Sequence, residues 1–202
     1  MNMFVAGMTG TGKSYMIHSL LRNVDKPIYA VSNKIEDYYQ LERVSGKKFK
    51  LVEVESGKRI KKLPDDNIFF TFGFITHEEK VDFMDDLALH IMQKRNVVLY
   101  VDEAHDVLAA QGAYSKGLES LIAGARAKGI HVIIISQRPQ NVKKSVINNC
   151  KWIVTFKLNE YNSAEAMVKH MQNVDVEDIK NLNLYEFFVY NAYTGKLTKE
   201  RL

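Results

Sequence analysis

The sequence predicts an α/β fold in which a mostly parallel central sheet is flanked by helices. Three observations lead to this fold class. Short apolar segments alternate along the chain with segments of helical spacing, as in parallel sheets covered on both faces. A glycine-rich loop separates the first apolar segment from the first helical one, and an Asp-Glu pair ends a later apolar segment.

The first half of the chain contains three apolar segments. "MNMFVA" at 1–6 predicts a strand, and "KSYMIHSLLRN" at 13–23 has helical spacing. "PIYAVS" at 27–32 predicts a second strand, followed by a helix over 34–44. "NIFFTFGF" at 67–74 is the third apolar segment. This order favours a parallel sheet with helical connections.

The longest predicted helix covers residues 76–94. Thr76 and Glu79 have the spacing of a capping box, which satisfies free backbone N–H groups at a helix start. Apolar residues follow on one helical face. They are Phe83, Met84, Leu87, Ala88 and Ile91.

The second half of the chain predicts three further buried strands at 96–101, 131–136 and 151–156, because "NVVLYV", "HVIIIS" and "KWIVTF" are short and β-rich. A helix is predicted to begin near Asp175. The segment 185–202 predicts a strand, a Thr-Gly turn and a short polar strand.

The composition is that of a globular protein. With 202 residues, 46% of them hydrophobic, the simplest organisation is one domain over 1–202. The single cysteine excludes an intramolecular disulfide and a cysteine-rich zinc site. No apolar segment approaches the ~18 residues of a membrane span, and no signal-peptide pattern is present, so we expect a soluble intracellular protein. The net charge of +4 mildly favours an anionic partner.

The loop "GMTGTGKS" fits the pattern G-x-x-x-x-G-K-[ST] of a phosphate-binding loop, also called the P-loop or Walker A motif. Backbone N–H groups of such a loop surround the phosphates of a nucleotide. Lys13 is predicted to reach the β- and γ-phosphates, and the Ser14 hydroxyl to bind Mg²⁺. The predicted nucleotide-binding residues are Gly7, Met8, Thr9, Gly10, Thr11, Gly12, Lys13, Ser14 and Tyr15.

The acidic pair after "NVVLYV" predicts the second half of this chemistry (Walker B). An aspartate at the carboxyl end of a buried strand is where a P-loop enzyme needs its second magnesium ligand, and Asp102 has this position. Glu103 is predicted to polarise the attacking water. The cofactors predicted from the sequence are therefore ATP and Mg²⁺.

Several classes of P-loop protein share these two motifs. "DEAH" at 102–105 also occurs in nucleic-acid helicases, but these close a nucleotide between two lobes and this chain has room for one. Small kinases of nucleosides or nucleotides remain an alternative, although the lone cysteine excludes the zinc lid of one kinase branch. A regulator that binds a nucleotide without hydrolysing it is a third possibility.

A third block of residues separates these classes. In "GARAKGIHVIIISQRP", Ser136 and Gln137 end an apolar strand, where a neutral amide can contact the γ-phosphate. Together with the phosphate loop, "VLYVDEAH" and "INNCKWIVTFKL", this block resembles the FtsK–HerA superfamily of DNA-pumping ATPases. The resemblance covers residues 3–158, and the compact length is most similar to the genome-packaging ATPases of membrane-containing icosahedral viruses.

This resemblance implies a RecA-like P-loop NTPase core acting as a homo-oligomeric ring, hexameric or pentameric, around double-stranded DNA. It implies that ATP hydrolysis drives the DNA into a capsid, with capsid or portal-vertex proteins as partners. The implied location is the cytoplasm of the infected host cell, with the virion as a second location. It also places Arg126 at the subunit boundary as a trans-acting finger, for which Arg138 is the competing candidate.

Basic residues cluster in "KKFKLVEVESGKRIKK", which predicts a small β-hairpin insertion over residues 47–63 with a turn at Ser56-Gly57. Contacts to DNA phosphates and a solvated basic hairpin are equally compatible with this pattern. Lys143 and Lys144 raise the same two possibilities. The basic residues of this segment that are predicted to face phosphates in the first case are Lys47, Lys48, Lys58, Arg59, Lys61 and Lys62.

Two reactive residue types have ordinary structural explanations. Cys150 precedes a buried strand and is expected to be a small core residue. The histidines lack metal-ligand spacing, and His105 is expected to pack beside Glu103 rather than to bind a metal.

Overall fold

A computed structural model of the protein describes residues 2–202, so that Met1, the first residue of the predicted first strand, lies outside the described residues. One sheet contains all nine strands of this part of the chain, in the order β3-β4-β2-β5-β6-β1-β7-β8-β9. The strands are β1 (Met3–Ala6), β2 (Ile28–Ser32), β3 (Lys50–Val54), β4 (Ile68–Phe72), β5 (Val98–Val101), β6 (His131–Ser136), β7 (Trp152–Phe156), β8 (Glu186–Asn191) and β9 (Lys196–Arg201).

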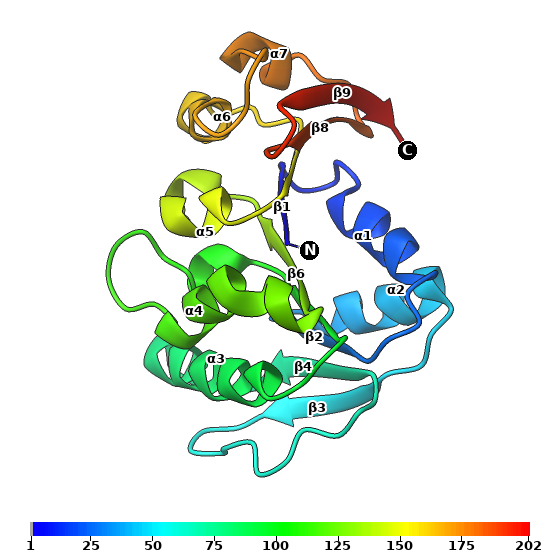
Figure 1. Ribbon diagram of the computed structural model, residues 1–202, viewed down its shortest axis with the longest axis vertical. Helices are drawn as coiled ribbons and strands as arrows, with labels where there is room; N and C mark the ends of the chain where they lie inside the picture. The colour runs from blue at the N-terminus through cyan, green and yellow to red at the C-terminus, as the bar shows by residue number, and fades with distance from the viewer. Residues whose placement is uncertain (1) are drawn as a thin grey trace.

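Helices cover both faces of the sheet (Figure 1). The α-helices are α1 (Lys13–Leu21), α2 (Ile35–Ser45), α3 (His77–Met92), α4 (Lys116–Gly124), α5 (Lys144–Asn148), α6 (Tyr161–Val168) and α7 (Val176–Lys180). Three short 3₁₀ helices are η1 (Ala104–Asp106), η2 (Ala125–Lys128) and η3 (Pro139–Asn141). α1 and α2 lie on one face, and α3, α4 and α5 lie on the other. The predicted mostly parallel sheet with flanking helices is therefore confirmed.

Two hydrophobic clusters explain why the central strands are apolar throughout. Along β5, Val98 packs in the cluster that contains Leu41 of α2, and Leu99 packs in the cluster that contains Leu87 of α3. Successive side chains of a strand point to opposite faces, so a strand covered on both faces must be apolar at every position. Fully burying one such side chain stabilises the fold by about 1.5–3 kcal/mol.

α3 begins where the sequence predicts. The Thr76 side chain accepts a hydrogen bond from the Glu79 N–H at 3.2 Å, and the Glu79 carboxylate accepts one from the Thr76 N–H at 2.8 Å. Both halves of the capping box are therefore present. A similar reciprocal pair between Asp175 and Asp178 starts α7.

The predicted β-hairpin over residues 47–63 is wrong. β3 is an edge strand that pairs in parallel with β4, and residues 55–67 return as a loop. The turn at Ser56–Gly57 forms, but the chain after it packs against α3 instead of pairing with β3. The Ile60 N–H donates to Asp86 Oδ2 at 2.7 Å, and Leu63 joins the core cluster. Burying apolar side chains of the returning loop against the core is favourable, and the loop therefore does not pair with β3.

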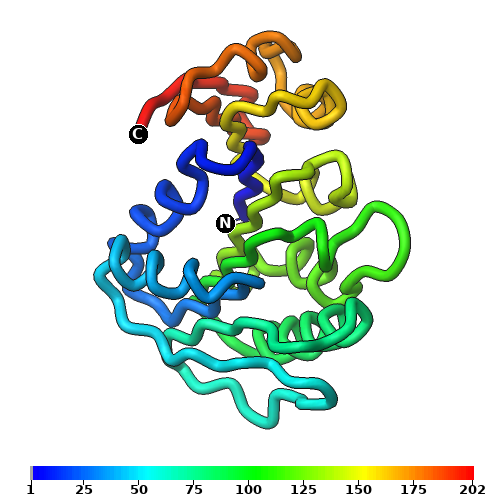
Figure 2. Tube along the Cα trace, turned by 180° about the vertical axis from the view of Figure 1, so that it is seen from behind, coloured from blue at the N-terminus to red at the C-terminus, as the bar shows by residue number. Residues whose placement is uncertain are grey.

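The predicted C-terminal strand pair is present. β8 pairs antiparallel with β7 and with β9. Beyond β9, the Leu202 N–H donates to the Tyr185 carbonyl at 3.0 Å. Figures 1 and 2 show from opposite sides that this hairpin lies beside the loop between β1 and α1.

Candidate nucleotide site

The seven parallel strands β1–β7 place their carboxyl ends at one edge of the sheet. In open α/β sheets, ligands bind at this edge. The loop after β1, the Asp102–Glu103 pair after β5 and Gln137 after β6 all lie there. The parallel topology thus brings together three segments that are far apart in the sequence.

The phosphate loop connects β1 to the first turn of α1. Gly12 precedes α1 with φ 100°, a left-handed conformation that favours glycine. At Gly7, a Cβ would lie 2.6 Å from Phe156 Cβ, so the close approach of β7 also requires glycine. The Thr11 hydroxyl donates to the Met8 carbonyl at 2.8 Å and stabilises the turn.

Lys13 is folded back over this loop. Its ammonium donates to the Met8 carbonyl at 2.7 Å, and the residue is only 6% exposed. Burial lowers the pKa of Lys13 to about 8, although the nearby Asp102 and Glu103 carboxylates favour its charged form. An anion placed beside this ammonium would favour the charged lysine further.

Asp102 lies at the carboxyl end of β5, beneath the loop. The Glu103 N–H donates to its Oδ1 at 2.8 Å, and the Tyr100 hydroxyl lies 3.2 Å from its Oδ2. Burial, together with the charges of Asp37 and Glu103, raises the pKa of Asp102 to about 6. A divalent cation would reverse this shift because it stabilises the ionised carboxylate.

Glu103 is held by side chains that follow two other strands, β2 and β6. Gln137 donates to its Oε1, and the Lys34 ammonium lies 3.3 Å from the same oxygen. His105 Nδ1 lies 3.5 Å from Oε2. Glu103 has φ 51°, which is uncommon for a residue with a side chain, so its carboxylate is held where regular backbone would not place it.

Gln137 links the acidic pair to the phosphate loop. The Thr9 hydroxyl donates to Gln137 Oε1 at 2.6 Å, while the amide nitrogen of Gln137 donates to Glu103. Ser136 is buried below them, and its hydroxyl lies 3.3 Å from His105 Nδ1. His105 therefore packs beside Glu103, as expected.

These residues surround a cleft of about 420 Å³. The sequence predicted most of its lining but missed four residues from other segments. Lys34, Asp37 and Gln40 follow β2, and Tyr185 precedes β8. The signal for Lys34 was available, because polar residues directly after a parallel strand lie at the ligand-binding edge. The lining residues are Thr9, Gly10, Gly12, Lys13, Ser14, Tyr15, Lys34, Asp37, Gln40, Asp102, Glu103, Gln137 and Tyr185.

The donor set of the cleft fits magnesium. Mg²⁺ prefers hard oxygen ligands and is usually held by one or two protein oxygens together with water and phosphate. Ser14 and Asp102 supply a hydroxyl and a carboxylate, and the Tyr100 hydroxyl interacts with both. Among residues 2–202, no cluster of three His, Cys, Asp or Glu side chains forms an all-protein metal site.

The two arginine candidates lie at opposite ends of strand β6. Arg126 belongs to η2, before the amino end of β6, and does not line the cleft. Its guanidinium carbon lies 5.4 Å from the centre of the Tyr193 ring. Arg138 directly follows Gln137 and is exposed at the carboxyl edge. Arg126 is thus separated from the phosphate loop of its own chain by the length of β6.

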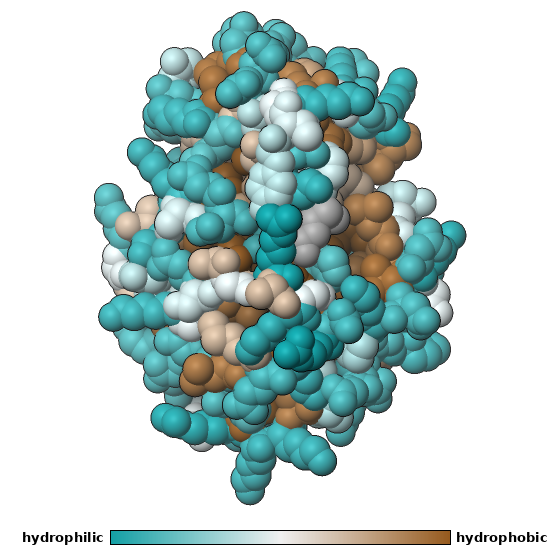
Figure 3. All heavy atoms as spheres, in the orientation of Figure 1, coloured by the Kyte–Doolittle hydropathy of each residue, from teal (hydrophilic) through white to brown (hydrophobic). Residues whose placement is uncertain are grey.

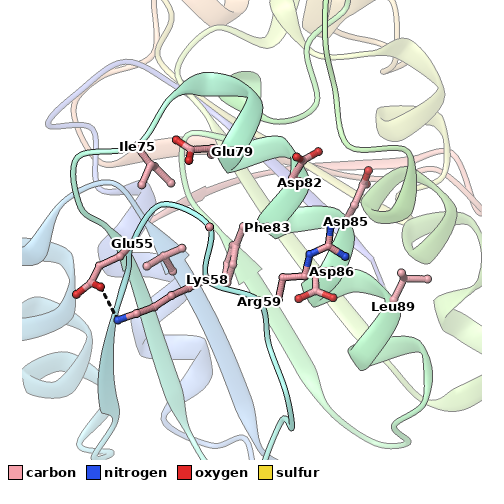
Figure 4. A pocket seen from close by; sticks show the side chains of 12 residues that line it. Glu55, Lys58, Arg59, Ile75, Glu79, Asp82, Phe83, Asp85, Asp86 and Leu89 are labelled. Carbon is pink, nitrogen blue, oxygen red and sulfur yellow. Dashed lines mark ion pairs between the residues drawn. The ribbon is translucent and has the colours of Figure 1, made fainter.

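Part of the basic segment is engaged within the chain. The Lys58 ammonium lies 2.5 Å from the Glu55 carboxylate, and Figure 4 shows Arg59 extending over the acidic side of α3. Lys48 pairs with Glu42 at 3.1 Å. Lys47, Lys61 and Lys62 make no ion pair within the described residues.

Lys143 is engaged as well. Its ammonium lies 3.2 Å from the Glu119 carboxylate and 3.3 Å from the centre of the Tyr114 ring. Lys144 is exposed, so that of this pair only Lys144 is available to an anionic partner. Cys150 is buried, as expected, and burial raises the pKa of its thiol to about 12.

Residues 1–141 match the family described as AAA domain (AAA_22). No curated protein matches the chain significantly. Within residues 2–202, every helix is too short or too polar to cross a bilayer.

Solved structures match almost the whole chain. The DNA-packaging ATPase B204 from Sulfolobus Turreted Icosahedral Virus has 18% identity and a TM-score of 0.73, over 99% of this chain and 96% of that chain. The genome packaging NTPase B204 from Sulfolobus turreted icosahedral virus 2, in complex with ATP-gammaS, has 17% identity and a TM-score of 0.74, over 98% and 96%. VirB4 of Thermoanaerobacter pseudethanolicus has 11% identity and a TM-score of 0.77, over 100% and 89%. These likenesses confirm the RecA-like P-loop NTPase fold that the resemblance to the FtsK–HerA superfamily implied.

Proposed function

The chain belongs to the AAA domain family, and from this premise we propose that it is an ATPase that moves double-stranded DNA. The observation that carries the proposal is the Thr9–Gln137–Glu103 chain of hydrogen bonds. It joins the phosphate loop to the acidic pair, so that the loop, the predicted base and the predicted sensor meet at one cleft.

Each side chain of the cleft has a defined task in this proposal. The loop N–H groups and Lys13 bind the phosphates, and the Ser14 hydroxyl and Asp102 hold Mg²⁺. When bound, the ion neutralises charge on the β- and γ-phosphates. Glu103 orients the attacking water and accepts its proton, and Gln137 contacts the γ-phosphate. Lys34 keeps the Glu103 carboxylate in place through its ion pair.

We further propose that the DNA is a viral genome that this ATPase moves into a capsid. The likeness to two packaging proteins over almost their whole length supports this assignment. The partners would be capsid or portal-vertex proteins, and the protein would act in the cytoplasm of the infected cell and associate with the virion.

A homo-oligomeric ring, hexameric or pentameric, completes the proposal. Figure 3 shows hydrophobic atoms gathered over α1 on a face that is otherwise mostly hydrophilic, and Leu20 of α1 is 48% exposed. Contacts between subunits would cover part of this surface. A ring also gives Arg126, remote from its own phosphate loop, a nucleotide to act on in the neighbouring subunit.

The kinase alternative is not favoured, because the three matching structures described above are packaging and VirB4 proteins rather than kinases. One assay separates the functions: phosphate release from ATP with no addition, with long duplex DNA and with a mixture of nucleosides, beside the mass of the ATP-bound assembly. Stimulation by duplex DNA supports the proposal. Phosphate transfer to a nucleoside would indicate the kinase, and binding of ATP without turnover under any condition would indicate a regulator.

A further inference from the structure

Tyr185 is the aromatic residue that the C-terminal hairpin contributes to the cleft. It lines the cleft together with the phosphate loop, and the residue remains 48% exposed. A Cβ on Gly12 would lie 3.1 Å from Tyr185 Cδ1, so the ring lies directly against the start of α1. An aromatic ring therefore lines the same cleft as the phosphate loop.

The backbone of Tyr185 is in a conformation that favours glycine. The Glu186 N–H donates to the Asn183 carbonyl at 3.2 Å, which makes Tyr185 the third residue of a four-residue turn. Tyr185 has φ 68°, and a positive φ at this position normally selects Gly or Asn. A bulky residue in this conformation is a true outlier, and such strain concentrates at ligand sites. The turn itself does not require a tyrosine, so the side chain needs another explanation.

The two ends of the cleft are lined by different residues. At one end, Thr9 contacts Gln137, which contacts Glu103, and the proposed chemistry at the γ-phosphate takes place there. A nucleoside triphosphate lying along the loop therefore places its nucleoside toward the other end, where the loop enters α1. Gly12 and Tyr15 are at that end, and Tyr185 lies against Gly12.

We propose that Tyr185 forms the base-binding subsite of the cleft and stacks on the nucleobase of the bound nucleoside triphosphate. This inference rests on the proposed nucleotide binding and names the group that holds the nucleoside end. The half-exposed ring leaves surface on which a base can stack. Aromatic stacking on a base contributes ~1–3 kcal/mol, which corresponds to about 5–150-fold in affinity.

The test compares a ligand with a base and a ligand without one. Calorimetry measures the binding of AMPPNP and of inorganic tripolyphosphate, both with Mg²⁺, to the wild-type protein and to Tyr185→Leu. AMPPNP affinity should fall about 5–150-fold, and tripolyphosphate affinity should stay within about twofold. Tyr185→Phe, which keeps the ring, should stay close to the wild type for both ligands.

Two further variants separate stacking from folding defects. Tyr185→Gly removes the ring and relieves the backbone, so it should weaken AMPPNP binding without lowering the melting temperature. Tyr161→Leu removes an exposed ring of α6 outside the cleft and should bind both ligands normally. Unchanged AMPPNP affinity in Tyr185→Leu, or an equal loss for both ligands, overturns the base subsite. Failure of the wild-type protein to bind AMPPNP would instead overturn the proposed function.

Discussion

The ammonium of Lys34 lies 3.3 Å from the carboxylate of Glu103. Burial lowers the pKa of Lys34, but the charge of Glu103 and the hydrogen bond to it outweigh this effect, so the pKa is raised overall. Lys34 therefore remains charged at neutral pH. The proposed base is held by an amide on one side and a cation on the other, and neither partner was assigned to it from the sequence.

The first prediction concerns Glu103. Glu103→Gln keeps the shape of the side chain but removes its basicity, so ATP affinity should stay within a few-fold while turnover falls about 10²–10⁴-fold. Lys34→Met keeps the carboxylate and should lose less turnover than Glu103→Gln. Lys13→Ala should weaken both ATP binding and hydrolysis. Phosphate release and nucleotide affinity are the measurements, and near-normal turnover in Glu103→Gln would remove this residue from the base role.

The second prediction concerns Tyr100, whose hydroxyl lies 3.2 Å from Asp102 Oδ2 and also interacts with Ser14. Groups that orient magnesium ligands typically contribute about 10–100-fold to metal affinity. In Tyr100→Phe, the Mg²⁺ concentration that gives half-maximal AMPPNP binding should rise by this factor, while binding in EDTA stays unchanged. Tyr29→Phe is the matched control, because that buried tyrosine donates to the Pro64 carbonyl instead. Identical Mg²⁺ curves for both variants would refute the role of Tyr100.

The third prediction concerns Arg126. Arg126→Ala subunits retain an intact phosphate loop, and Lys13→Ala subunits retain an intact arginine. If Arg126 acts on the nucleotide of a neighbour, mixed rings should recover activity that neither parent shows, because such a finger contributes about 10³–10⁵ in rate. The same mixture made with Arg138→Ala tests the competing candidate. Purely additive, near-zero activity in verified mixed rings would contradict the Arg126 role.

The fourth prediction uses the basic segment. Lys61 and Lys62 are exposed and make no ion pair within the described residues, whereas Lys48 and Lys58 are paired with Glu42 and Glu55. If the segment binds DNA, changing Lys61 and Lys62 to Gln should reduce the salt dependence of DNA binding by about one unit of slope per lost phosphate contact. The Lys48 and Lys58 double variant should change the slope less. Equal salt-dependence slopes in the wild type and the two double variants would indicate that the segment is solvated and does not contact DNA.

The fifth prediction concerns His18, which is 0% exposed and whose ring nitrogens have no hydrogen-bond partner within residues 2–202. Burial lowers its pKa from 6.5 to about 4. Between these values the unfolded chain binds more protons than the folded one, so the free energy of unfolding falls as the pH falls. His18→Phe should remove about 3 kcal/mol of this loss between pH 7 and pH 4. Urea unfolding at both pH values measures it, and an equal loss in both proteins would contradict the prediction.

The sequence predicted those parts of the site that depend on local pattern. The phosphate loop lies between a strand and a helix, and Asp102 and Gln137 each follow a strand, so local spacing predicts their place at the candidate site. Lys34 and Tyr185 depend instead on strand order. β2 lies beside β5, and β8 lies two strands from β1, and no local pattern encodes these neighbours. The predicted hairpin over 47–63 was wrong because strand pairing also depends on strand order. β3 pairs with β4 rather than within its own segment.

The packing of Tyr185 and Leu202 against Gly12 also has a consequence for biosynthesis. The loop around residue 12 is synthesised before residues 185 and 202, which supply two of the side chains that enclose it. Contacts of such long sequence separation form late and slowly. A nascent chain therefore exposes an unfinished phosphate loop until residues 185–202 have been synthesised, and the nucleotide cleft closes only after that.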